Sequence, residues 1–199
     1  MKQKTEAQKQ KIMDAAHGLF LEKGPANVSM SDIAAAMGGS KATIYNYFKN
    51  KDEVFAEVML ASIHKIKGEA FQAVDCSQPL PAFLKMFGNM YLKFTLSPKM
   101  MDVRRTVVAH IGVDDTGRIM YERGLKPAWM RIAGRMEDAM KSGEMKKGNP
   151  WHAATQFKAL LEADLLDQNL MGVKKRTTQK EIEDAVNRAL DLFGCYYFD

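Results

Sequence analysis

The chain of 199 residues has few of the features that mark secreted or membrane proteins. Its two cysteines, Cys76 and Cys195, are too few for a disulfide framework, which favours a reducing compartment. No apolar run approaches the roughly 18 residues that cross a bilayer, and the polar N-terminus does not resemble a signal peptide. We therefore expect a cytoplasmic protein without a membrane partner.

The sequence also lacks the spacings that accompany catalysis or metal binding. Its four histidines are far apart, and neither Glu-x-x-His, His-Glu-x-x-His nor Cys-x-x-Cys occurs. There is no Gly-x-Ser-x-Gly nucleophile elbow. The run from Gly38 to Lys41 resembles part of the phosphate-binding-loop motif, but the first glycine of that motif and the strand that should precede it are missing. We expect no catalytic residue, no metal site and no cofactor.

Strand signals are absent as well, whereas helical periodicity recurs along the whole chain. No sustained alternation of β-branched and aromatic residues occurs, and no Asn-Gly or Asp-Gly turn. Capping residues and prolines mark several helix starts. The pattern predicts an all-α fold with helices at residues 6–22, 30–37, 41–47, 51–74, 80–96, 98–111, 115–124, 126–142, 150–171 and 179–197.

Positive charge is concentrated near the N-terminus. Residues 1–52 contain eight lysines, no arginine and five acidic residues, a net charge of +3 out of the +5 of the chain. The remaining 147 residues are almost balanced. We predict a division into an N-terminal domain, residues 1–52, and a helical domain, residues 53–199. The excess of lysine permits a polyanionic partner without proving one.

The N-terminal pattern predicts a helix-turn-helix. A first helix ends near Gly24. Two short helices follow, and the turn between them contains Gly38, a residue that accepts the positive φ of a tight turn. Residues 30–37 and 41–47 are therefore expected to form the paired helices.

The second helix of the pair is rich in hydrogen-bonding side chains. Such side chains can reach base edges in the major groove, while lysines and hydroxyls hold phosphates. Taken singly, the tyrosines also suit ordinary packing, and the serine suits a helix cap. The side chains are Ser40, Lys41, Thr43, Tyr45, Asn46 and Tyr47.

Lys51 falls in the first turn of the next predicted helix, where a cation opposes the helix dipole. A phosphate held by this lysine and the free helix amides would explain the placement.

The segment that contains these residues resembles the DNA-binding signature of TetR/AcrR-family transcriptional regulators. The likeness begins near Lys11 and runs to about Val58. Its most specific part is the run from Tyr45 to Phe55, an aromatic pair, a Lys/Asn turn, and a lysine and an acid before a helix. The segment from residue 29 to residue 55 reads SMSDIAAAMGGSKATIYNYFKNKDEVF.

The resemblance implies a role for several residues. It implies that Ser40, Lys41, Thr43 and Asn46 face bases or the DNA backbone. It also implies that Tyr47 and Lys51 hold phosphates, and that the region from Ser29 to Ser31 contacts the backbone. Gly39 departs from the family pattern, which usually has a small apolar residue there; this would loosen the turn.

The C-terminal three quarters is expected to bind a small molecule of unknown identity, because proteins of this kind carry a variable ligand domain. The segment from Phe94 to Met145 resembles, more weakly, the C-terminal domain of AefR-like members. Methionine suits adaptable apolar pockets, although each one also suits an ordinary core. The predicted lining is Met86, Phe87, Met90, Tyr91, Phe94, Arg104, Met120 and Trp129. Arg104 and its neighbour Arg105 cannot both point inward, because consecutive helical positions diverge by about 100°.

The last two predicted helices have broad apolar faces. These faces either pack on the core of their own subunit or form a four-helix interface in a twofold dimer. The resemblance favours a homodimer, in which two helix-turn-helix motifs read a palindromic site. The predicted interface residues are Phe157, Leu161, Leu165, Val186, Leu190 and Phe193.

These expectations combine into a DNA-binding transcriptional regulator, a repressor released from a palindromic operator by a small molecule. An alternative is an all-helical enzyme or carrier that keeps a helix-turn-helix only for packing. A regulator of the same fold that needs its ligand in order to bind DNA is a further alternative. A measurement of DNA binding distinguishes the enzyme or carrier from a regulator. Titration of the effector against operator binding distinguishes a regulator released by its ligand from one that needs its ligand to bind DNA.

Overall fold

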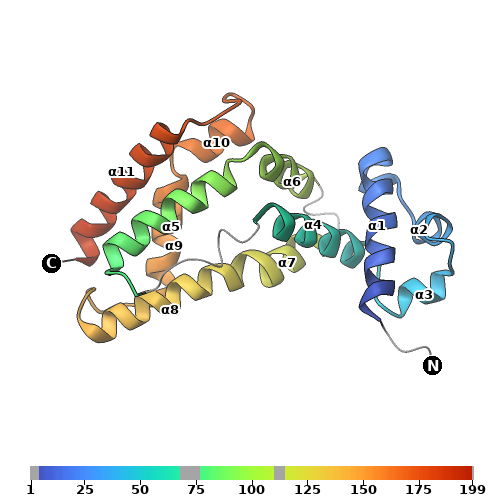
Figure 1. The fold of residues 1–199 in the computed structure, drawn as a ribbon, viewed down its shortest axis with the longest axis horizontal. Helices are drawn as coiled ribbons and strands as arrows, with labels where there is room; N and C mark the ends of the chain where they lie inside the picture. The colour runs from blue at the N-terminus through green and yellow to red at the C-terminus, as the bar shows by residue number, and fades with distance from the viewer. Residues whose placement is uncertain (1–4, 68–76, 110–114, 199) are drawn as a thin grey trace. The chain divides into compact units, whose positions relative to one another are not determined.

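The computed structural model describes residues 5–67, 77–109 and 115–198, and every regular element in these ranges is a helix (Figure 1). The elements are α1 (Glu6–Lys23), the 3₁₀ turn η1 (Pro25–Asn27), α2 (Met30–Ala36), α3 (Lys41–Tyr45), α4 (Lys51–Lys67), α5 (Leu80–Thr95), α6 (Pro98–Val108), α7 (Thr116–Met120), the π-helical turn η3 (Tyr121–Leu125), α8 (Lys126–Ser142), α9 (Pro150–Glu162), α10 (Leu165–Leu170) and α11 (Gln179–Tyr197). The all-α prediction is confirmed.

Two predicted helices differ from the structure in kind. The segment predicted as one helix over residues 150–171 is two helices, α9 and α10, separated at Ala163 and Asp164. The segment predicted over residues 115–124 is the short helix α7 followed by the π-helical turn η3. The predicted ends of helices 51–74 and 98–111 fall on residues 68–74 and 110–111, which lie outside the described residues.

Side-chain caps set the starts of the N-terminal helices. The Thr5 hydroxyl accepts a hydrogen bond from the Gln8 amide at the start of α1. Ser29 and Asp32 form a reciprocal capping box at the start of α2. These bonds satisfy backbone donors that have no partner inside the helix. Gly38, in the turn before α3, has a φ of 65°, the left-handed conformation that glycine adopts most easily.

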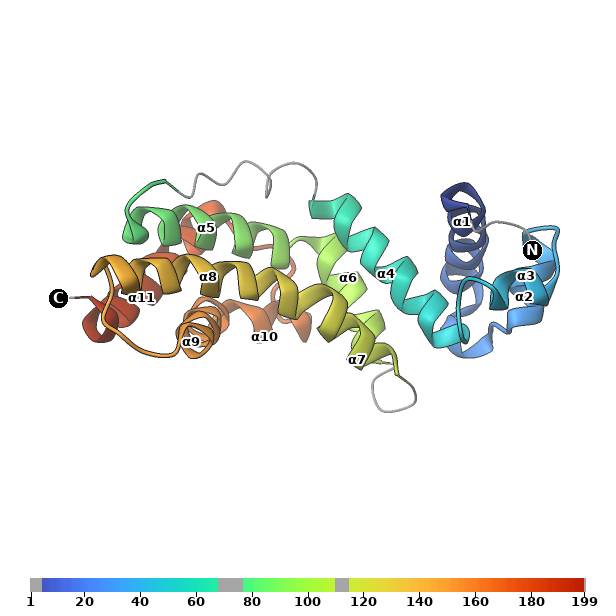
Figure 2. The same ribbon diagram turned by 90° about the horizontal axis from the view of Figure 1, so that it is seen from below.

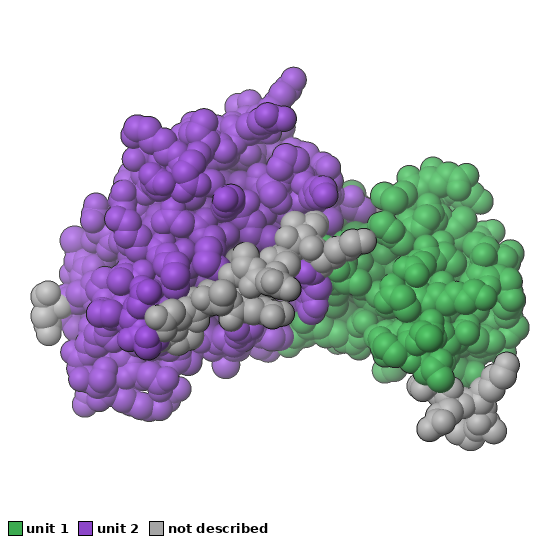
Figure 3. Space-filling model, viewed as in Figure 1, with its two compact units in different colours: residues 1–63, 107–123 green, residues 64–106, 124–199 purple. Residues whose placement is uncertain are grey.

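The chain divides into two compact units, drawn in different colours in Figure 3. One contains Met1–Ile63 together with Val107–Arg123, and the other contains His64–Thr106 together with Gly124–Asp199. This division differs from the predicted boundary after residue 52, because most of α4 belongs to the first unit. Its apolar residues pack there: Val54 and Phe55 are buried.

The first unit has a small core beneath the helix-turn-helix. Helix α1 packs on α2, and α2 packs on α3 (Figure 1). The rings of Phe20 in α1 and Phe55 in α4 meet edge to face at 5.2 Å between centroids. Ile44 and Phe48 contribute fully buried side chains. The core therefore holds α3 through its apolar side and leaves the other side uncovered by this unit.

The second unit is a helical bundle. Helix α8 packs on α9, while α11 packs on both α5 and α9; Figure 2 shows α5 beside α8. Gly88 in α5 permits close approach, because a Cβ at this position would lie 3.1 Å from side-chain atoms of both Leu161 and Val186. The rings of Phe157 and Phe193 join α9 to α11 inside the bundle.

Candidate nucleic-acid interface

Helix α3 presents a polar face to solvent. Ile44 anchors it to the core with no exposed surface, whereas Lys41, Tyr45 and Asn46 are exposed, Tyr45 to 53%. Thr43 is only half-buried. Among the described residues, the side chains of Lys41 and Asn46 have no hydrogen-bonding partner, so both are available to a ligand outside the chain.

Ser40 and Thr43 have local partners. The Ser40 hydroxyl accepts a hydrogen bond from the Thr43 amide and so caps α3. The two side-chain oxygens, Ser40 Oγ and Thr43 Oγ1, also lie 3.0 Å apart and share one hydrogen. A hydroxyl can accept and donate at once. Ser40 thus serves as the helix cap that ordinary packing predicts, and each hydroxyl keeps further hydrogen-bonding capacity.

Tyr47 is positioned by the N-terminal segment. Its hydroxyl accepts a hydrogen bond from the Thr5 amide at 2.9 Å. The side chain is half-buried, so its ring is held while its phenolic hydrogen is free to donate. This geometry suits a phosphate contact at the predicted position.

Lys51 has an intramolecular partner that the sequence did not indicate. Its Nζ donates a hydrogen bond to the Pro25 carbonyl oxygen at 2.9 Å and links the start of α4 to η1. A structural reason for a cation in the first turn of α4 therefore exists without DNA. Two of the three ammonium hydrogens remain for a phosphate.

The start of α2 adds a second set of hydroxyls. Ser29 is exposed, but its hydroxyl and amide both bond to the Asp32 carboxylate, which keeps the pKa of Asp32 below its ordinary value. Ser31 is exposed in the first turn of the helix. Ser29 therefore has a capping role, and Ser31 is the more available of the two hydroxyls.

Gly39 leaves room that a neighbouring side chain fills. A Cβ at this position would lie 2.7 Å from Met37 Cε. Where the family pattern has a small apolar residue, this chain uses the flexible end of Met37 to cover the turn. The expected loosening of the turn is offset by this packing.

The start of α4 is fixed by its own carboxylate. Asn50 Oδ1 accepts from the Glu53 amide, and the Glu53 carboxylate accepts from the Lys49 amide. The Lys49 amide is also the main reason why the pKa of Glu53 lies below its ordinary value. These two hydrogen bonds therefore fix the turn between α3 and α4 to the first turn of α4.

A network of ion pairs that the sequence did not reveal lies on the same helix. Arg123 binds Glu53 at 3.0 Å and Glu57 at 2.7 Å, and Lys9 of α1 binds Glu57 at 3.0 Å. Burial raises the pKa of Glu57, but the bonds from Lys9 and Arg123 outweigh it and hold the pKa below its ordinary value. These pairs connect α1, α4 and η3 within the first unit. Arg123 is 66 residues or more away from its partners, which explains why no local pattern indicates the contact.

The structure brings together three of the predicted effector-binding residues. Phe87 and Tyr91 of α5 meet Trp129 of α8 at 5.4 and 5.0 Å between ring centroids, and all three are buried. Half-buried residues of the set lie on α5 and α6, namely Met86, Met90, Phe94 and Arg104. Met120 belongs to the other compact unit.

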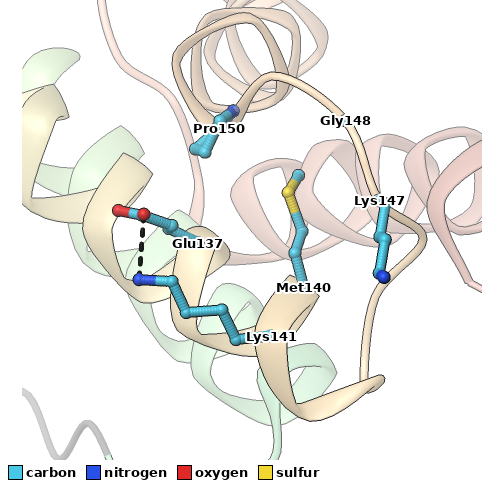
Figure 4. Close-up of a pocket in the computed structure, with 6 residues that line it drawn as sticks. All are labelled: Glu137, Met140, Lys141, Lys147, Gly148 and Pro150. Atoms are coloured by element: carbon cyan, nitrogen blue, oxygen red, sulfur yellow. Dashed lines mark ion pairs between the residues drawn. The ribbon is translucent and has the colours of Figure 1, made fainter.

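Two hollows among the described residues lie away from the predicted lining. The larger, about 500 Å³, lies between the end of α8 and the start of α9, beside the ion pair of Glu137 with Lys141 (Figure 4). The smaller, about 250 Å³, is lined mainly by charged residues near Lys174 and Arg188. Neither has an apolar lining of the kind that small-molecule pockets usually have.

Most of the predicted dimer residues are inside their own subunit. The buried ones are Phe157, Leu161, Leu165, Val186 and Phe193, and Leu190 is half-buried. The apolar faces of α9 and α11 therefore build the bundle core, which is the plainer of the two predicted roles. On α11 the exposed apolar residues are Leu192 and Tyr196.

Family comparison agrees with the geometry of the N-terminal unit. The pattern of the bacterial regulatory proteins of the tetR family matches residues 12–58, and that of the C-terminal domain of AefR-like transcriptional repressors matches residues 82–199. The chain belongs to the TetR family. The resemblance predicted from the sequence is confirmed, and the protein is a DNA-binding transcriptional regulator with an N-terminal helix-turn-helix and a C-terminal helical domain.

Individual relatives match between about 70% and nearly all of the chain. The HTH-type transcriptional regulator AcrR of Shigella flexneri is 37% identical, with 96% of this chain and 92% of the relative covered. The uncharacterized regulator YhgD of Bacillus subtilis is 26% identical over 71% of this chain and 74% of its own length. Among solved structures, the flavonoid-responsive regulator FrrA has a TM-score of 0.82 and 28% identity, with 97% and 98% of the two chains covered.

These TetR-family relatives are transcriptional regulators, and no enzyme family is indicated. In the described ranges, no three His, Cys, Asp or Glu side chains gather as metal ligands would. The helices that the structure describes include none with the length and apolar character to span a bilayer.

Proposed function

We propose that this protein is a homodimeric, cytoplasmic repressor that leaves a palindromic operator when a small molecule binds its C-terminal helices. The observation that carries the DNA-reading part is the exposed face of α3, where Lys41 and Asn46 have no partner among the described residues. Helix α3 enters the major groove, Asn46 reads a base edge, and Tyr47 and Lys51 hold phosphates.

Two copies are needed because one helix-turn-helix reads few base pairs, whereas a twofold pair reads two half-sites. The exposed Leu192 and Tyr196 on α11 supply apolar surface for such an interface. A ligand that prefers the conformation unfit for DNA shifts the population away from the operator. A coupling of about 1–3 kcal/mol changes operator affinity roughly 5- to 150-fold.

The relative FrrA is named for its response to flavonoids, which are aromatic. The aromatic cluster of Phe87, Tyr91 and Trp129 supports an effector of similar character in this protein. Binding would separate these rings, because they are in contact with one another in the structure.

The test measures binding of the protein to DNA from upstream of its own reading frame. Fluorescence anisotropy at moderate salt monitors this binding. Saturable binding to a palindromic site is expected. Asn46→Ala should relax the preference at one or two positions of each half-site, because a paired base edge is worth roughly 1–3 kcal/mol of discrimination. Asn187→Ala, an exposed asparagine of α11, is the matched control and should bind as the parent does. An unchanged sequence profile in Asn46→Ala would show that Asn46 does not read bases.

A further inference from the structure

A buried polar cluster lies in the C-terminal bundle beside the aromatic rings. Its centre is the Glu162 carboxylate at the end of α9, whose side chain is 10% exposed. Tyr91 donates its hydroxyl to Glu162 Oε1 at 2.5 Å, and Lys158 forms an ion pair with the same carboxylate. Arg104 of α6 lies 3.8 Å from Glu162 Oε1. We call these four residues the Glu162 cluster.

The Glu162 cluster carries more positive than negative charge. Lys158 and Arg104 are cations, Glu162 is the one carboxylate, and Tyr91 is neutral because burial, with Glu162 beside it, raises the pKa of Tyr91 well above its ordinary value. Lys158 and Arg104 are 22% and 23% exposed, so both are partly removed from water. An uncompensated charge in such surroundings is costly, and one additional anion would balance it.

Arg104 is the cation with unused hydrogen-bonding capacity. In the described part of the chain, its guanidinium makes no hydrogen bond, since 3.8 Å is beyond hydrogen-bond distance. Its neighbour Arg105 is different: it donates to the carbonyl oxygens of Asn169 and Leu170 and to Asp102. One arginine of the pair is thus committed to the fold, and the other offers a planar set of donors that suits a carboxylate.

Aromatic surface adjoins this charge. The Tyr91 ring, whose hydroxyl belongs to the Glu162 cluster, packs against Trp129 at 5.0 Å and against Phe87 at 5.8 Å between centroids. A ligand ring placed beside these side chains would gain apolar burial and edge-to-face or stacked contacts. Charge and ring recognition therefore meet at one residue, Tyr91.

We propose that the effector is an aromatic acid whose anionic oxygens bind Arg104 while its ring packs against Tyr91 and Trp129. This inference rests on the proposed function, because it names the chemical class of the small molecule that the regulator senses. Lys158 adds a second cation, and Glu162 holds Lys158 and Tyr91 in place. The Tyr91 and Trp129 rings separate to admit the ligand, so the surroundings of Trp129 change on binding.

The test uses benzoate, 2-naphthoate and 4-hydroxycinnamate, each paired with its neutral amide. The full-length Trp151→Phe variant keeps Trp129 as the one tryptophan, because the chain has two. Titrations are followed by Trp129 fluorescence. At least one acid is expected to bind saturably, roughly tenfold or more tightly than its amide. If no acid in the panel is preferred over its amide, the proposal is overturned.

Two substitutions should act in opposite directions. Arg104→Gln should weaken binding of the preferred acid roughly 10- to 100-fold and leave the amide unchanged. Glu162→Gln keeps an acceptor for Tyr91 but removes the competing negative charge, so the acid should bind more tightly. A merely structural cluster would lower affinity in both variants, and that outcome would overturn the proposal. Lys99→Gln, which removes an exposed charge from the same helix α6, is the matched control.

Operator binding without any probe is measured for each variant, together with the melting temperature. Failure of the parent protein to bind the operator would refute the proposed function. Intact operator binding without a preference for acids would refute the effector class alone. A single cooperative melting transition of Glu162→Gln, even at a lower temperature than that of the parent, shows that the fold has been retained.

Discussion

Lys41 is the first residue of α3 and Lys51 is the first residue of α4, and the structure gives them different roles. Lys41 is exposed and has no partner among the described residues, whereas Lys51 donates to the Pro25 carbonyl oxygen. Because a cation in the first turn of a helix opposes the helix dipole, the position of Lys51 predicts a phosphate partner. The hydrogen bond to η1 shows that part of its role lies within the fold.

Lys41→Ala and Lys51→Ala are therefore expected to differ. Lys41→Ala should leave the free energy of unfolding within about 0.5 kcal/mol and reduce the slope of log K against log salt by about 0.9, the value for one neutralised phosphate. Lys51→Ala should reduce the slope similarly and also lower the free energy of unfolding by roughly 0.5–1.5 kcal/mol. Urea unfolding and salt titrations measure the two effects. Reduced stability of Lys51→Ala with an unchanged slope would show that Lys51 does not hold a phosphate.

Residue-level prediction succeeded where the signal was local. The apolar spacing predicts that Ala42, Ile44 and Phe48 face inward; Ile44 and Phe48 are buried, whereas Ala42 is exposed. The polar neighbours Thr43 and Asn46 were expected to stay accessible, and they are not buried. Contacts between residues far apart in the sequence could not be predicted, because no local pattern indicates them. One example is the hydrogen bond from the Thr5 amide to the Tyr47 hydroxyl, 42 residues away.

At the scale of elements, helix starts were predictable because short-range caps define them. Thr178 and Glu181 have the spacing of a capping box, and the structure contains that box at the start of α11. The break between α9 and α10 was not predictable, because Ala163 and Asp164 include neither glycine nor proline. Asp164 stands at the N-cap position of α10, but its side chain makes no capping hydrogen bond.

The cap of α11 makes the stability of the protein sensitive to acid. Glu181 accepts from Lys174 and from the Thr178 amide and hydroxyl, which lowers its pKa from 4.5 to about 2. A carboxylate with a lowered pKa stabilises the fold above its unfolded pKa and loses this effect as the pH falls to its folded value. The contribution of Glu181 should therefore disappear between about pH 4.5 and pH 2.

Glu181→Gln should flatten this acid limb when the melting temperature is followed from pH 6 to pH 2. Glu183→Gln, an exposed position of the same helix outside the cap, should keep the parent's limb. Equal acid limbs in the parent and Glu181→Gln would mean that the cap contributes nothing to pH dependence.

Arg123 connects η3 with α4 through ion pairs with the Glu53 and Glu57 carboxylates. Helix α7 directly precedes η3 in the chain. Arg123→Gln should loosen this connection by about 1 kcal/mol, given the usual worth of partly exposed ion pairs. Amide hydrogen exchange in α7 should then become roughly fivefold faster. Arg118→Gln is the control, because Arg118 pairs locally with Asp115. Equal exchange in both variants would show that the two carboxylates do not hold this segment.

At the scale of the whole molecule, the fold class and family were predictable from the sequence, but the interface of the proposed homodimer was not. Periodicity shows that α9 and α11 have apolar faces; it does not show what covers them. Phe157 and Val186 turn out to pack inside their own bundle. What remains for a partner is the exposed side of α11, with Leu192 62% and Tyr196 73% exposed.

We therefore expect the dimer to depend on Leu192 and Tyr196. The double substitution Leu192→Glu and Tyr196→Glu places two like charges against their copies across a twofold interface, which should convert the dimer to a monomer in sedimentation equilibrium. Folding should be retained, because both side chains are exposed, and operator affinity should fall because a monomer presents one reading helix instead of two. Leu21→Glu, at a leucine of α1 that is 75% exposed, should remain dimeric. A dimeric double variant would place the interface on another surface.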